Sequence, residues 1–275
     1  MTVAASAEAT PGAAVAGRRL PSAPDWVAPL ATVALLLALW ELVVRSGLIS
    51  ETSIPLMSAT AAELFSQLAQ GAFWTAVADT LQGWALGLGI ALVLGIPLGV
   101  LIGSSRWTFR ALRAPIEFLR PIPSVALIPL AVLIYGTGLE SKVFLAAFAS
   151  FWPLLIQTIY GVQDLDPVAT DTARSFGMGR FARLYRVTLP SAVPYIATGI
   201  RISSAVALIL AVTAELVIGS PGLGRSINVA RSGGNLEAMY ALIVATGLLG
   251  YLLNIATTRA ERRVLHWHPS QRTAA

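Results

Sequence analysis

The sequence predicts an all-α integral membrane protein with six transmembrane helices, and two observations carry this prediction. Hydrophobic residues make up 56% of the 275-residue chain and charged residues only 12%, whereas a soluble domain carries roughly 25% charged residues. Six apolar segments are each close to the roughly 20 residues that a helix needs to cross a hydrocarbon core about 30 Å thick. The composition excludes an ordinary soluble enzyme and leaves little room for a large domain outside the membrane.

The first apolar segment, residues 26–44, follows a polar N-terminal stretch. Residues 1–25 are rich in Ala, Pro and Thr and predict a disordered cytoplasmic tail. Segment 26–44 is longer than the apolar core of a usual signal peptide and is interpreted as a retained span. The transmembrane domain is expected at residues 26–258, followed by a cytoplasmic tail at 259–275. The other spans are expected at residues 80–102, 115–135, 143–162, 193–218 and 239–256.

The third apolar segment is interrupted by four prolines, Pro115, Pro121, Pro123 and Pro129. Proline removes a backbone donor and bends a helix, and such breaks persist at membrane depth only where protein or a water-filled cavity covers the freed groups. Two interpretations stay open: a discontinuous helix that lines a pathway, or a short helix that begins after Pro123. Glu117 and Arg120 are spaced for a local ion pair.

The connection between the first two spans, residues 45–79, carries the pattern of a short helix. Thr60 and Glu63 match a capping box, and Gly71 is suited to end the helix. The pattern predicts an interfacial helix that packs on the bundle.

The distribution of basic residues predicts that both termini lie in the cytoplasm. With that orientation most of the 19 Lys and Arg residues are cytoplasmic, as the positive-inside rule requires. They are Arg18, Arg19, Arg106, Arg110, Arg113, Arg174, Arg180, Arg183, Arg186, Arg259, Arg262, Arg263 and Arg272. The outer side would hold Arg45, Lys142, Arg225 and Arg231. The net charge of +5 is thus explained by topology, and no nucleic-acid partner is predicted.

Several kinds of chemical site are missing from the sequence. Cysteine is absent, which excludes disulfides, thiolate metal sites and cysteine nucleophiles. His266 and His268 both fall in the C-terminal tail, and no metal site is predicted. The single lysine, Lys142, is not part of a Gly-x-x-x-x-Gly-Lys-Ser/Thr phosphate loop. The chain is therefore expected to be no ATPase and to bind no cofactor itself.

The longest inward connection, residues 163–192, predicts two short helices. Asp166 is suited to cap a helix that has Pro167 at its first position, and Gly177 is suited to end it, so a helix is expected at 167–176. A second amphipathic helix is expected at 180–188. The pair Leu189-Pro190 is expected to end it before the fifth span.

This connection resembles the Glu-Ala-Ala loop of ABC importer permeases. The resemblance lies in Asp171-Thr172-Ala173, Gly177 and Val187-Thr188-Leu189-Pro190, at the spacing of that loop. It departs from the family pattern at Asp171 for Glu, Thr172 for Ala and Val187 for Ile. The resemblance implies that the loop docks on a cytoplasmic ATPase. The residues that it assigns to coupling are Asp171, Thr172, Ala173, Arg174, Gly177, Leu189 and Pro190.

Further segments resemble the branch of that family that imports aliphatic sulfonates, taurine and nitrate. They are residues 119–123, 127–130, 136–142, 199–202, 214–215 and 222–224. The resemblance implies a type I ABC importer permease fold in the bacterial cytoplasmic membrane, a permease homodimer or a pair with a close relative, and an external solute-binding protein. It also implies separate ATPase subunits that hold ATP and Mg. It does not identify the substrate.

Polar residues in the fifth span are candidates for the translocation pathway. Arg201, Ser204, Leu208 and Glu215 fall on one helical face, and intramembrane charges usually face the bundle interior. Arg201 and Glu215 are about 21 Å apart along the helix, at a rise of 1.5 Å per residue, and cannot pair. One hypothesis is that this face lines the pathway with Glu215 near an outer gate. The alternative is that a neighbouring helix satisfies each charge.

Two other functional classes are alternatives to the ABC importer. An ATP-independent secondary transporter or channel is the main alternative, although no internal inverted repeat is evident. A membrane-embedded enzyme is less well supported, because no buried pair of catalytic groups has a suitable spacing.

Overall fold

The computed structural model describes residues 27–266, and within that range every regular element is helical. The helices are α1 (Val27–Arg45), α2 (Met57–Leu68), α3 (Gly71–Gly103), α4 (Arg106–Leu119), α5 (Ile128–Tyr135), α6 (Leu139–Gln163), α7 (Pro167–Ser175), α8 (Arg180–Arg183), α9 (Leu189–Ile218), α10 (Leu223–Ser232) and α11 (Leu236–Val264), with a 3-10 turn at Ser124–Leu127 and a π turn at Leu184–Thr188. The predicted tail at 1–25 and residues 267–275 of the second predicted tail lie outside the described residues.

By length and apolar character, residues 27–266 contain up to six membrane crossings. Five helical stretches qualify alone, and they contain α1, α3, α6, α9 and α11. The sixth is the pair formed by α4 and residues Ser124–Tyr135. The prediction of an all-α protein with six spans is confirmed, although α3 begins well before the expected residue 80.

The third span is discontinuous. Its two halves meet at an angle of 79°, and the break lies between Leu119, which ends α4, and Ser124. Pro115 is inside α4, so a helix precedes the break. The segment therefore consists of two helical parts and not of a lone short helix after Pro123, and whether it lines a pathway stays a prediction.

The predicted ion pair between Glu117 and Arg120 is wrong. Glu117 instead accepts a hydrogen bond of 2.7 Å from Nε of Arg113. Arg113 lies one turn earlier on the same face of α4, whereas Arg120 is the C-cap, where the helix ends.

Close contact between α3 and α6 forms the centre of the bundle. Five glycines of α3 face successive residues of α6: Gly83 faces Lys142, Gly87 faces Ala146, Gly95 faces Leu154, Gly99 faces Thr158, and Gly103 faces Val162. The offset between partners is constant, so the two helices run in parallel. A Cβ at Gly87 would lie 2.5 Å from Cβ of Ala146, so only a residue without a side chain permits this approach.

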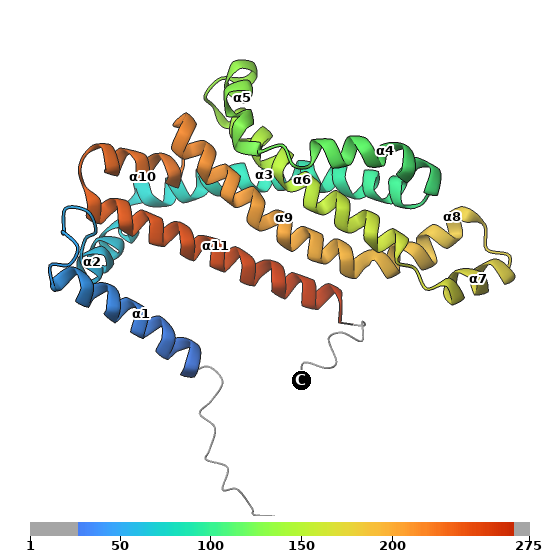
Figure 1. Cartoon of the computed structure of the whole chain (residues 1–275), viewed down its shortest axis with the longest axis horizontal. Coiled ribbons are helices and arrows are strands. Elements are labelled where there is room, and N and C mark those ends of the chain that lie inside the picture. Colours follow the sequence, from blue (N-terminus) through green and yellow to red (C-terminus); the bar gives the residue numbers. More distant parts are fainter. Residues whose placement is uncertain (1–26, 267–275) are drawn as a thin grey trace, which may run out of the picture.

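The other helices surround this pair. α9 packs along α6, and α11 contacts α2, α9 and α10. α1 contacts the bundle near its C-terminal end, beside α2, and then diverges from it (Figure 1). Val44 is the buried residue of α1, and leucines such as Leu35 are exposed, as expected for a surface that faces lipid.

The capping box predicted at Thr60 and Glu63 is wrong, because α2 begins earlier, at Met57. The Thr60 hydroxyl donates to the carbonyl of Leu56 inside the helix at 3.0 Å. The carboxylate of Glu41 accepts bonds from both the N–H and the hydroxyl of Ser58. A side chain of α1 thus satisfies a first-turn donor of α2 that a cap residue would otherwise serve.

Candidate functional site

α7 is capped at both ends by its own residues. The Asp166 carboxylate accepts a bond from the Val168 N–H at 2.8 Å, and Pro167 occupies the first turn. After the helix ends, Gly177 has a φ of +71° and the Met178 N–H donates to the Ala173 carbonyl at 3.0 Å. This is a Schellman-type end. The predicted extent of this helix, at 167–176, agrees with the structure to within one residue.

The helix that follows does not end at Leu189-Pro190, so that prediction is wrong. α8 continues through the π turn directly into α9. The Leu189 N–H donates to the Leu184 carbonyl, five residues back. The extra residue in this turn accommodates Pro190, which has no N–H to donate and whose ring would otherwise crowd the preceding turn.

The loop presents polar and apolar side chains to its surroundings. Asp171 and Arg174 form a pair at 3.1 Å, and their side chains are 70% and 61% exposed. Ala173 is buried, and Phe176 is 81% exposed. Of the other residues predicted to act in coupling, Thr172 and Gly177 are exposed, and Leu189 and Pro190 are partly buried. α7 and α8 project from one end of the bundle (Figure 1).

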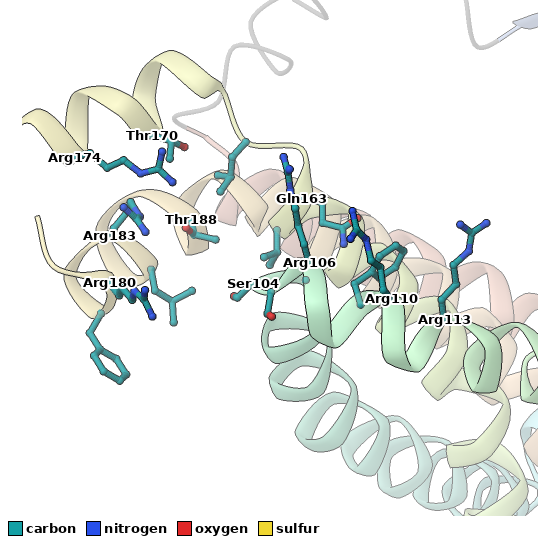
Figure 2. A pocket seen from close by; sticks show the side chains of 17 residues that line it. Ser104, Arg106, Arg110, Arg113, Gln163, Thr170, Arg174, Arg180, Arg183 and Thr188 are labelled. Atoms are coloured by element: carbon teal, nitrogen blue, oxygen red, sulfur yellow. The ribbon is translucent and has the colours of Figure 1, made fainter.

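A cavity of about 950 Å³ separates this loop from the start of α4. Arginines from both sides point toward it: Arg174, Arg180 and Arg183 come from α7 and α8, and Arg106 and Arg110 come from α4 (Figure 2). The N-terminus of α4, capped by Ser105, also borders the cavity.

A buried ion pair lies near the opposite end of the bundle, where α9 meets α10. Nζ of Lys142 is 2.9 Å from Oε1 of Glu215, and the two side chains are 1% and 0% exposed. Lys142 also donates to the carbonyls of Asp79 and Pro221, each at 2.8 Å. Lys142, which is predicted to lie on the outer side of the membrane, is in the first turn of α6, and its side chain is buried in the protein.

The second carboxylate oxygen of Glu215 extends this network to α3 and α10. It accepts bonds from the Thr80 hydroxyl at 2.9 Å and from the Gly224 N–H at 3.0 Å. The Thr80 oxygen in turn accepts a bond from the Leu223 N–H at 2.9 Å. The network therefore fixes the first turn of α10 to α3, α6 and α9.

The approach of α10 to Glu215 requires glycine. Gly222 has a φ of +145°, and a Cβ there would lie 2.1 Å from the Glu215 carboxylate. A Cβ at Gly224 would lie 2.4 Å from the Val212 carbonyl. A side chain at either position would force α10 away from α9.

The four residues predicted to line the pathway occupy two different surroundings. Nη1 of Arg201 is 3.7 Å from a carboxylate oxygen of Glu261 on α11. Ser204 and Leu208 are buried and border a cavity of about 220 Å³ between α9 and α11. Glu215 is enclosed in the network described above. In this single chain each charge thus faces an opposite charge on a neighbouring helix, and a role in translocation stays a prediction.

The described residues contain no group of three or more His, Asp or Glu side chains placed to hold a metal ion. Nδ1 of His266 is 3.0 Å from the carbonyl of Arg263. His268 lies outside the described residues.

Comparison with known proteins identifies the family. The model of the family described as "binding-protein-dependent transport system inner membrane component" matches residues 95–266. The chain belongs to this family. It is a multi-pass permease subunit of an ABC importer in the inner membrane.

The permease is similar to curated members of the family. It is 36% identical over 197 residues to the nitrate import permease protein NrtB of Leptolyngbya laminosa, covering 71% of this chain and 70% of the relative. It is 32% identical over 245 residues to the taurine transport system permease protein TauC of Escherichia coli, covering 87% and 89% of the two chains.

Solved structures show the same fold at lower identity. A chain of the MetNI methionine ABC transporter in an inward-facing conformation has a TM-score of 0.62 and 22% identity, covering 70% of this chain and 96% of that chain. A chain of a bacterial ABC transporter involved in alginate import has a TM-score of 0.57 and 16% identity, covering 87% and 96% of the two chains. The predicted type I importer fold is confirmed.

Sequence reasoning missed the partner of Glu215 and the arginine cavity. Three segments that carried the family resemblance, at 136–142, 214–215 and 222–224, meet in the buried network. The signal in the sequence that could have indicated the pair is the single lysine, Lys142, beside one apolar span together with Glu215 inside another. Apart from Arg174, which the family resemblance assigns to coupling, the arginines of the cavity entered the prediction only as evidence for topology, although they fall in two clusters of sequence.

Proposed function

We propose that this permease is the transmembrane subunit of an ATP-driven importer that receives a sulfonate-, taurine- or nitrate-like solute from an external binding protein. The similarity to two relatives, a nitrate permease and a taurine permease, supports this substrate class. Both solutes carry an oxyanion group. The family description, which specifies dependence on a binding protein, supports the external partner.

The loop at 163–192 is proposed to couple the permease to a separate ATPase that holds ATP and Mg. The observation that carries this proposal is the form of α7: a short helix, capped at both ends, that projects from the end of the bundle with Asp171 and Arg174 exposed. A rigid, projecting helix is suited to transmit movement from a partner, because its caps hold it in shape while it is pushed.

Cross-linking tests this coupling role directly, since the chain has no cysteine. Thr172→Cys is paired with cysteines in the groove of the ATPase subunit, and Glu237→Cys at the far end of the bundle is the matched control. We expect a cross-link from position 172 and none from position 237. Absence of the cross-link at 172, or labelling of that cysteine by a membrane-impermeant reagent in intact cells, would contradict the proposal.

The alternative is a secondary transporter or channel that works without ATP. The two mechanisms can be distinguished by measuring solute uptake by reconstituted transporter whose ATPase subunit has an inactive phosphate loop. We expect solute uptake to stop in that variant. Uptake that continues at the normal rate would favour the alternative.

We also propose that the transporter contains two copies of this chain. A single copy has an exposed apolar surface on α5, where Leu133 is 83% and Ile134 58% exposed, and six spans supply only half of a pathway in this proposal. Co-expression of differently tagged copies checks it: we expect each tag to recover the other. Recovery of one tag alone would indicate a single copy or a pair with a different permease.

A further inference from the structure

The cavity beside the α7–α8 loop is lined by an unusual concentration of positive charge. Its volume is about 950 Å³, and none of the acidic residues within positions 27–266 borders it. Its basic residues are Arg106, Arg110, Arg113, Arg174, Arg180 and Arg183. Like charges gathered around one space repel one another, so an anion in that space would stabilise the arrangement.

Four of these arginines have no acidic partner within residues 27–266. Arg113 pairs with Glu117 and Arg174 pairs with Asp171. The remaining four, Arg106, Arg110, Arg180 and Arg183, are in no ion pair with any described residue. The cavity therefore keeps a net positive charge after every local pair is counted.

Helix direction adds to this charge. α4 begins at the cavity, with Ser105 as N-cap and Arg106 as the first residue of a 14-residue helix. The N-terminus of a helix carries a partial positive charge and unpaired N–H groups, both of which favour an anion. The guanidinium groups contribute planar pairs of donors that match the oxygens of phosphate and sulfonate groups.

We propose that this cavity is an oxyanion-binding site that takes a phosphate- or sulfonate-type group. Two sources of that group are the headgroup of an anionic phospholipid and a free oxyanion. The volume exceeds what one small anion fills, and Trp107, next to Arg106, is 80% exposed. An exposed tryptophan beside arginines on an amphipathic helix is typical of the membrane interface, and basic pockets of this kind bind lipid headgroups.

The experiment measures binding to the full-length permease and needs neither ATPase nor uptake, so it is independent of the proposed transport function. The cavity variant combines Arg106→Gln, Arg110→Gln, Arg180→Gln and Arg183→Gln. The matched control removes the same charge from exposed arginines elsewhere, with Arg225→Gln, Arg231→Gln, Arg259→Gln and Arg262→Gln. Size-exclusion profiles and thermal unfolding establish that both variants fold.

Native mass spectrometry after purification with phosphatidylglycerol and phosphatidylcholine forms the lipid arm. We expect the wild type and the control to retain phosphatidylglycerol and the cavity variant to retain about tenfold less. Calorimetric titration of delipidated protein with inorganic phosphate and with methanesulfonate forms the free-anion arm. A second outcome is that the wild type retains no phosphatidylglycerol but binds a free anion saturably, with binding lost only in the cavity variant. That result would support the site with a free oxyanion as its ligand.

Two results would overturn the proposal. The first is equal binding by the cavity variant and the control in both arms. The second is cross-linking that places carboxylates of the ATPase inside the cavity of the assembled transporter, because the arginines would then serve a protein interface.

Discussion

Lys142 and Glu215 form an ion pair of 2.9 Å that is closed to solvent, with side chains 1% and 0% exposed. Both groups are also hydrogen-bonded to other parts of the chain, so neither charge is left without partners. These additional hydrogen bonds help to offset the cost of removing two charges from water, which is large for a buried ion pair. The pair joins α6 to α9, and its further bonds hold α10 in place.

Removing one partner of this pair is expected to destabilise the protein strongly. Lys142→Met leaves Glu215 buried without its counter-ion, and Glu215→Gln leaves the ammonium group unpaired. Each is expected to cost about 3–5 kcal/mol of stability. The double variant is expected to cost less than the sum, because it leaves no unpaired charge. Thermal unfolding in detergent, followed by the fluorescence of the seven tryptophans, measures the effect.

An exposed pair supplies the control for this comparison. Arg113→Gln removes a pair of similar length whose side chains are 64% and 63% exposed, and it is expected to cost no more than about 1 kcal/mol. Additive losses in the Lys142 and Glu215 double variant would show that the two residues do not stabilise each other.

Gly222→Ala is expected to displace α10. A Cβ there would lie 2.1 Å from the Glu215 carboxylate, at a φ of +145° that other residues rarely adopt. We expect a loss of about 1–3 kcal/mol from overpacking, seen as a lower midpoint of thermal unfolding. Gly234→Ala is the matched control, since Gly234 also has a positive φ, +72°, but has no atom within 4 Å of the added Cβ. Equal losses in the two variants would attribute the effect to backbone strain alone.

The sequence was sufficient where structure depends on neighbours in the chain. The caps of α7 need only Asp166, Pro167 and the residues around Gly177, so its bounds were predictable. Prediction from the sequence failed where the bounds of a helix depend on a residue that is distant in the chain. α2 begins before Thr60 because Glu41 of α1 binds Ser58.

The buried network shows the same limit for the candidate site. Lys142 and Glu215 lie in different spans, and no local pattern indicates that they meet. At Leu189-Pro190 the failure has another cause. Proline was expected to end the helix, but a π turn accommodates it and the helix continues into the membrane. The presence of Pro190 is evident from the sequence, but the change of the preceding turn from α to π geometry is not.

The predicted pathway face of α9 can be tested by chemical labelling. Ser204 is 2% exposed in this structure, so a cysteine there is expected to react slowly with a small polar thiol reagent in the resting transporter. If this face lines the pathway, the rate is expected to rise several-fold during ATP hydrolysis. Val217→Cys, at a position of α9 that does not border the cavity between α9 and α11 and whose native side chain is 62% exposed, is the control. A rate at Ser204→Cys that ATP does not change would contradict the pathway prediction.

Asp166→Ala is expected to weaken coupling without unfolding the permease. The carboxylate caps α7 through its 2.8 Å bond to the Val168 N–H, and loss of such a cap costs about 1 kcal/mol. Amide exchange in α7 is expected to rise by about fivefold, since opening of that helix becomes easier by the same free energy. ATP-driven uptake should fall, because a frayed helix transmits movement poorly. Asp166→Asn keeps an acceptor at the cap and is expected to retain both properties. Uptake that falls equally in both variants would show that the charge of Asp166, and not the cap, is what coupling requires.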